Sequence, residues 1–180
     1  MTKVLLLVGF FLFGAALPAS SACNLEVHAP WTSAKAEGLM LNAYAVGEVC
    51  GYTAVVLTVT NKAGKTLSRN AQHVSIFTSE LGMSRNEVQE ALDTWLQIGN
   101  DTKINMTGKL PDWSEGKDGP TRDGEFGYYI DETLDRSFYL EQRAADRPLF
   151  CTVSGIESET CIIVTGVDAV QEFGGISFPG

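Results

Sequence analysis

The fold is signalled most clearly by residues 148–164, PLFCTVSGIESETCIIV. Two runs rich in β-branched and aromatic residues, 148–153 and 160–164, flank the turn-like segment SGIES, residues 154–158. Folding this hairpin brings Cys151 and Cys161 near opposite positions, where a cross-strand disulfide is geometrically feasible. The stretch therefore predicts an antiparallel hairpin closed by a disulfide.

The first 22 residues have the parts of a secretory signal. Lys3 supplies a positive charge, and residues 4–17 form an apolar run shorter than the roughly 18 residues that span a bilayer. Ser20 and Ala22 are small residues before a cleavage site at Cys23. We therefore expect residues 1–22 to be removed and 23–180 to form a single exported domain, secreted to the periplasm or outside the cell. A retained anchor is the alternative.

An exported chain changes how its four cysteines are interpreted. No C-x-x-C pair is present, so disulfides are favoured over a zinc site. Of the three pairings that four cysteines allow, Cys23–Cys50 with Cys151–Cys161 is the most local. Lipidation of Cys23 is an alternative, which would leave one thiol without a partner.

Strand patterns recur on both sides of one helical pattern. Ser84 and Glu87 form a capping box, and an apolar stripe at helical spacing follows, with Gly99 as the expected end of a helix over 85–98. Trp95 lies in this stripe and is interpreted as a core residue. The other segments are expected to be strands: 39–46, 53–61, 65–67, 73–78, 126–130, 137–142, 149–154 and 161–166. The predicted class is α+β, an antiparallel sheet or small β-sandwich with one amphipathic helix packed on it, stabilised by disulfides.

Charge and motifs restrict the function. The chain has 22 acidic and 13 basic side chains and a net charge of -9, which argues against nucleic-acid binding. Only His28 and His73 could act as bases near neutral pH, and neither G-x-S-x-G nor H-E-x-x-H occurs. We therefore expect a protein without enzymatic activity or cofactor that binds another protein, of the inhibitor, immunity or assembly-factor type.

The candidate binding site is a polar segment over residues 100–125, a length typical of functional or disordered loops. We expect its acidic side chains and its tryptophan to bind a partner with a basic surface. These residues are Asp112, Trp113, Glu115, Asp118 and Asp123. The segment also carries glycosylation sequons at Asn100 and Asn105.

Alternatives remain open for this segment. Trp113 could instead pin the segment to the sheet, and the carboxylates could simply face solvent. The same carboxylates could bind calcium or cleave sugars as an acid/base pair in a secreted hydrolase. A small-ligand carrier with a pocket between sheet and helix is the third class.

Overall fold

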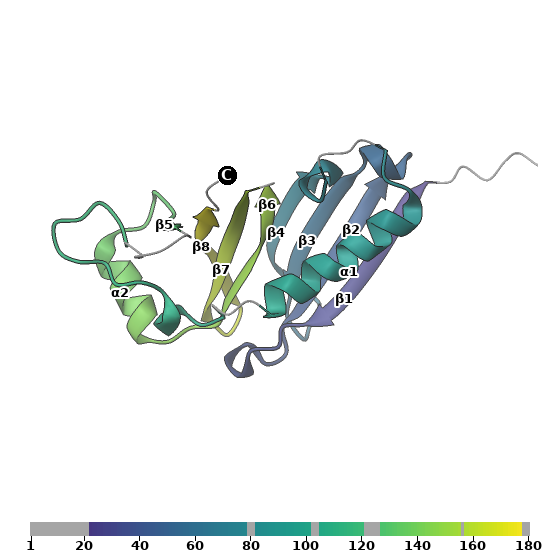
Figure 1. Ribbon diagram of the computed structural model, residues 1–180. Coiled ribbons are helices and arrows are strands. Elements are labelled where there is room, and N and C mark those ends of the chain that lie inside the picture. Colours follow the sequence, from purple (N-terminus) through teal and green to yellow (C-terminus); the bar gives the residue numbers. More distant parts are fainter. Residues whose placement is uncertain (1–21, 79–81, 102–104, 121–126, 156, 178–180) are drawn as a thin grey trace, which may run out of the picture.

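The computed structural model describes residues 22–78, 82–101, 105–120, 127–155 and 157–177. The protein is α+β and largely β: two four-stranded antiparallel sheets, two α-helices and two disulfides (Figure 1). The predicted class is confirmed. Residues 1–21 of the predicted leader lie outside the described residues.

The first sheet is built in chain order, β1-β2-β3-β4. Side chains alternate across it, so Val55, Leu57 and Val59 of β3 are buried together on one face, as their spacing predicts. The strand β4 is mostly polar, and the predicted strands 65–67 and 73–78 overlap only its two ends. The bounds are β1 Cys23–Pro30, β2 Met40–Gly47, β3 Ala54–Thr60 and β4 Thr66–His73.

The second sheet has the order β5-β8-β7-β6. Cys151 of β6 lies directly opposite Cys161 of β7, and these two residues form one disulfide. Cys23 and Cys50 form the other, so the most local pairing is confirmed. The bounds are β5 Gly127–Ile130, β6 Leu149–Gly155, β7 Ser158–Gly166 and β8 Ala169–Ser177.

The predicted helix is present as α1, Arg85–Asp101. Its capping box is formed: the Ser84 N–H donates to Glu87 Oε2 at 2.7 Å, and the Glu87 N–H donates to Ser84 Oγ at 3.3 Å. The expected end at Gly99 is wrong, because the helix continues through that residue.

Two expected strands are wrong. Residues 137–142 lie inside a second helix, α2 (Arg136–Ala144), where Asp135 caps the N-terminus by accepting the Phe138 N–H at 2.8 Å. Residues 73–78 contain the end of β4 and a 3₁₀ turn, η3 (Val74–Ile76). Strands β1 and β8 were not among the predicted elements.

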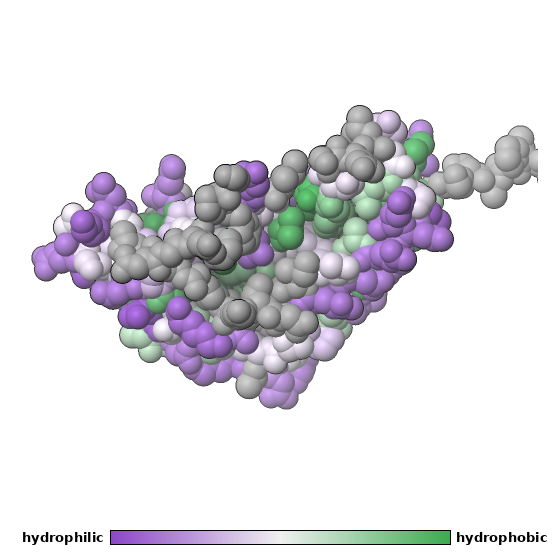
Figure 2. Space-filling view, in the orientation of Figure 1, coloured by the Kyte–Doolittle hydropathy of each residue, from purple (hydrophilic) through white to green (hydrophobic). Residues whose placement is uncertain are grey.

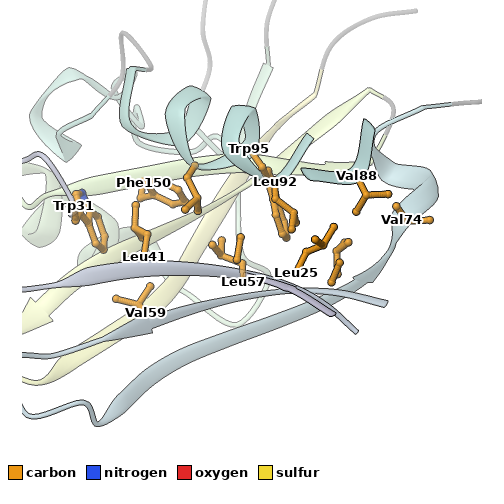
Figure 3. Packing of buried hydrophobic residues seen from close by; sticks show 14 of the residues in the cluster. Leu25, Trp31, Leu41, Leu57, Val59, Val74, Val88, Leu92, Trp95 and Phe150 are labelled. Carbon is orange, nitrogen blue, oxygen red and sulfur yellow. The ribbon is translucent and has the colours of Figure 1, made fainter. Parts of the chain in front are cut away.

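Each face of the second sheet borders a different hydrophobic core. Phe150 and Val164 join the first core, which lies between the first sheet, α1 and β6 (Figure 3). Leu149, next to Phe150 in sequence, points into the second core with Tyr139 of α2 and Phe173 of β8. The first sheet, by contrast, buries only one face against described residues.

Candidate functional site

The predicted site tryptophan is buried in the second core. Trp113 is 7% exposed, and its ring meets that of Tyr139 edge to face at a centroid distance of 5.6 Å. Its indole N–H donates to the carbonyl oxygen of Lys117 at 2.7 Å. This is the arrangement expected if Trp113 pins its segment to the fold, and a binding role for it stays a prediction.

One stripe of α2 holds this segment in place. Arg136 Nε donates to the Trp113 carbonyl at 2.8 Å, and the Tyr139 hydroxyl donates to the Pro111 carbonyl at 2.6 Å. Arg143 Nε donates to the Leu110 carbonyl at 2.9 Å. Residues 110–117 are therefore a strap tied to α2 by side chains, and we call this segment the α2 strap.

The acidic residues predicted to bind a partner lie on the outside of the α2 strap or next to it. Asp112 approaches Arg143 at 3.7 Å, whereas Glu115 and Asp118 are exposed. Asp123 lies outside the described residues. Within the described ranges, no group of three or more His, Cys, Asp or Glu side chains could hold a metal ion.

The two histidines have different partners. His28 Nε2 lies 3.2 Å from Glu26, and its Nδ1 lies 2.8 Å from the amide oxygen of Asn42. His73 Nδ1 lies 2.9 Å from Ser75 Oγ. One histidine thus has a carboxylate and the other a serine, so the described contacts do not assemble a serine–histidine–carboxylate triad around either of them.

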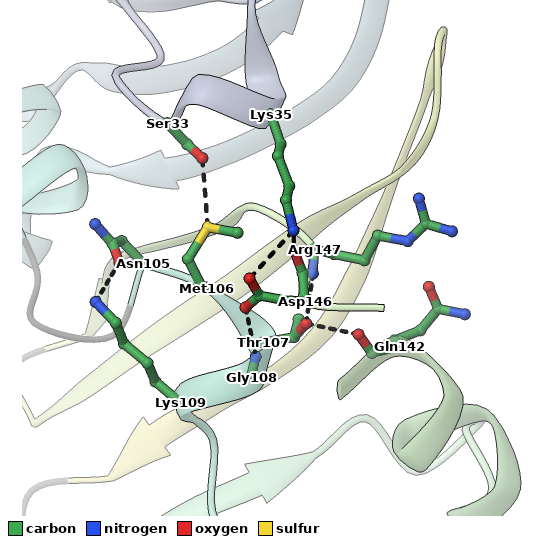
Figure 4. A network of polar contacts seen from close by, with 10 residues as sticks. All are labelled: Ser33, Lys35, Asn105, Met106, Thr107, Gly108, Lys109, Gln142, Asp146 and Arg147. Atoms are coloured by element: carbon green, nitrogen blue, oxygen red, sulfur yellow. Dashed lines mark hydrogen bonds and ion pairs between the residues drawn. The ribbon is translucent and has the colours of Figure 1, made fainter. Parts of the chain in front are cut away.

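A polar network joins the segment between β1 and β2, residues 105–109, and the end of α2 with the residues that follow it (Figure 4). Lys35 Nζ donates to Asp146 at the carbonyl (2.7 Å) and the carboxylate (3.1 Å). The Thr107 hydroxyl donates to the Gln142 carbonyl at 2.6 Å and accepts the Arg147 N–H at 2.7 Å. A neighbouring hollow of about 590 Å³ has mixed polar and apolar walls. These hydrogen bonds hold the segments together, which gives this region a structural role.

A second hollow, of about 480 Å³, lies between η3, α1 and the end of β6. Phe77 and Trp95 meet edge to face at 5.2 Å, and the Trp95 N–H donates to the Val153 carbonyl at 3.1 Å. Figure 2 shows hydrophobic surface gathered above α1, with the polar residues of the helix along its lower border. We call this hollow the α1 groove; its lining residues are Ile76, Phe77, Glu87, Glu90, Ala91, Thr94, Trp95 and Val153.

The rim of the α1 groove is negatively charged. Glu87 and Glu90 line it and are exposed on α1. Hydrogen bonds from the Ser84 backbone and side chain lower the pKa of Glu87, so this carboxylate stays ionised at neutral pH. The basic side chain of this helix, Arg85, bonds the carbonyls of Ala22 and Asn24, away from the groove. The groove thus combines an apolar floor with anionic sides.

Of the groove residues, the sequence singled out only members of the helix, and it assigned Trp95 to the core. That assignment agrees with 2% exposure of Trp95, yet the indole also forms part of the groove. Phe77 and Val153 are not recognised from the sequence as site residues, because each lies in a segment expected to be a strand, 73–78 or 149–154, and only the fold brings the two to α1.

Comparison of the chain with protein-family models, with curated proteins and with solved structures finds no match. Among the described helices, none is long and apolar enough to cross a membrane. The two disulfides are typical of a protein that folds in an oxidising compartment.

Proposed function

We propose that this chain is an exported, non-catalytic protein that binds a partner protein with a basic surface, and that the α1 groove is the contact site. The observation that carries the proposal is the apolar floor that the partly exposed Phe77 and Val153 form with the buried Trp95, beside the carboxylates of Glu87 and Glu90. The leader-like sequence and the disulfides support secretion to the periplasm or outside the cell.

The groove suits a particular kind of contact. An apolar side chain of the partner would replace water over the floor, at about 25 cal/mol for each Å² of apolar surface buried. Lysine or arginine next to that side chain would reach the anionic rim. The net charge of -9 would also steer a basic partner towards the molecule and raise the association rate.

The test uses short synthetic peptides that place one leucine or phenylalanine between two lysines, with glutamate in place of lysine in the matched peptides. Fluorescence anisotropy would measure their affinity for the disulfide-bonded chain. We expect the lysine peptides to bind more tightly, with affinity falling as salt is added. Glu90→Lys should weaken that binding by about three- to tenfold, because it removes an attraction and adds a repulsion.

Two further variants make this result specific. Glu132→Lys makes the same change of charge at an exposed residue between β5 and α2 and should leave affinity near that of the wild type. Asp118→Lys tests the site first predicted, beside the α2 strap. Equal binding of both peptide classes, or equal losses in Glu90→Lys and Glu132→Lys, would contradict the groove. A loss of peptide affinity confined to Asp118→Lys would instead place the contact site in the polar segment 100–125.

A further inference from the structure

The outer face of the first sheet is uncovered by the described chain. Backbone pairing aligns most of its outward side chains in three rows across β1, β2, β3 and β4. The rows are Asn24–Val46–Ala54–His73, Glu26–Tyr44–Val56–Ala71 and His28–Asn42–Thr58–Arg69. Val46 is 56% exposed, and Tyr44 and Val56 border a shallow hollow of about 490 Å³ on this face.

Charge on this face is restricted to its edges. The two middle strands contribute only neutral side chains to the three rows, with Tyr44 and Val56 side by side at the centre. Glu26 lies on the edge strand β1 and Arg69 on the opposite edge strand β4. A centre without charged side chains, with charges confined to the periphery, is typical of a protein–protein interface.

We infer that this face is the interface of a homodimer, in which the first sheets of two copies pack face to face. The inference is independent of the α1 groove, which is built from η3, α1 and β6. A second copy fits this face because the face is complementary to itself, with an acidic residue on one edge strand and a basic residue on the other. A two-fold axis parallel to the strands, between β2 and β3, places β1 of each copy over β4 of the other.

That arrangement brings the edge charges together. Arg69 of one copy would lie over His28 of the other and one row from Glu26, within reach of its carboxylate. Within a single copy the two residues are three strand spacings apart, about 14 Å, and cannot pair. Tyr44 would meet Val56 of the other copy at the centre. Each contact occurs twice, as an isologous interface requires.

The dimensions also fit. Strands of seven or eight residues, four across, give an outline of about 26 by 19 Å, on the order of 500 Å² before side-chain relief is added. A standard interface buries about 800 Å² of accessible surface on each partner. Association therefore requires nearly the whole face, including both charged edges.

The test is sedimentation velocity of the disulfide-bonded chain over a concentration series that reaches the high micromolar range. We expect a monomer–dimer equilibrium. Glu26→Arg and Arg69→Glu should each weaken the dimer by about tenfold or more, since each change places like charges together at two symmetric positions. The double variant, Glu26→Arg with Arg69→Glu, should return the dissociation constant to within about threefold of the wild-type value.

The matched control is Val167→Lys, which adds a charge at a residue 94% exposed in the turn between β7 and β8 and should leave the dimer unchanged. Circular dichroism of each variant at monomer concentrations would establish that it is folded. A monomer at every concentration would overturn the inference. A dimer that the two single variants do not weaken, or that the double variant does not restore, would overturn it as well.

Discussion

Glu159 shows how the position of one carboxyl group affects stability. It lies on β7 between Val153 of β6 and Ile176 of β8 and is 8% exposed. Burial raises the pKa of Glu159 above the ordinary value of 4.5. The folded state therefore holds this proton more tightly than the unfolded state does. This difference in proton binding stabilises the folded state fully below about pH 4.5. The contribution is lost as the pH rises through the pKa that Glu159 has in the folded state.

We therefore expect Glu159→Gln, which removes the buried charge, to raise the melting temperature at pH 7. The gain should shrink as the pH is lowered and vanish near pH 4. Calorimetry at a series of pH values would measure it. Glu172→Gln, at an exposed residue of β8, is the control and should show no such pH-dependent gain. A lower melting temperature for Glu159→Gln at pH 7 would contradict the prediction.

A hydroxyl group of helix α2 holds the α2 strap. Tyr139 is fully buried, and burial raises the pKa of its hydroxyl, which stays protonated and donates to the Pro111 carbonyl at 2.6 Å. Tyr139→Phe should cost about 1 kcal/mol and accelerate amide exchange in the α2 strap, because that carbonyl loses its donor. Exchange followed by mass spectrometry would measure this, with Tyr129→Phe, at a residue 46% exposed, as the control. Unchanged exchange in residues 110–117 would refute this role.

The sequence predicted the elements whose signals are local. The capping box at Ser84 and the two β-rich runs around Cys151 and Cys161 lie within short segments, and both elements are present. The helix α2 was mistaken for a strand because its aromatic residues suggest a strand. Its short length, nine residues, shows little of a helical period.

Tertiary contacts explain the remaining differences. In β8, Gly174 has φ +148°, and a side chain there would overlap the carbonyl oxygen of Tyr129 on β5. The glycine is needed because two strands approach closely, which nothing in its own segment reveals. The α1 groove is similar: Phe77, Trp95 and Val153 meet only through the fold. The acidic composition, by contrast, could indicate a basic partner but not where it binds.

Strand β6 connects the two hydrophobic cores. Its consecutive residues Leu149 and Phe150 enter different cores, and α1 packs against it from the side of the first sheet. A substitution that destabilises one core should therefore destabilise the other as well, since the second sheet contributes side chains to both cores. This arrangement supports the prediction that residues 23–180 form a single domain.

Phe150→Leu tests that cooperativity. Leaving space in the first core should cost about 1–2 kcal/mol, equivalent to a roughly tenfold increase in global opening. If the chain unfolds as one unit, the slowest-exchanging amides of β3, in the first core, and of β8 around Phe173, in the second core, should accelerate by the same factor. Native-state hydrogen exchange would measure both strands, and Val167→Ala, at an exposed turn residue, should alter neither. Acceleration of β3 with β8 unchanged would mean that the two cores open independently and that the single-domain prediction is wrong.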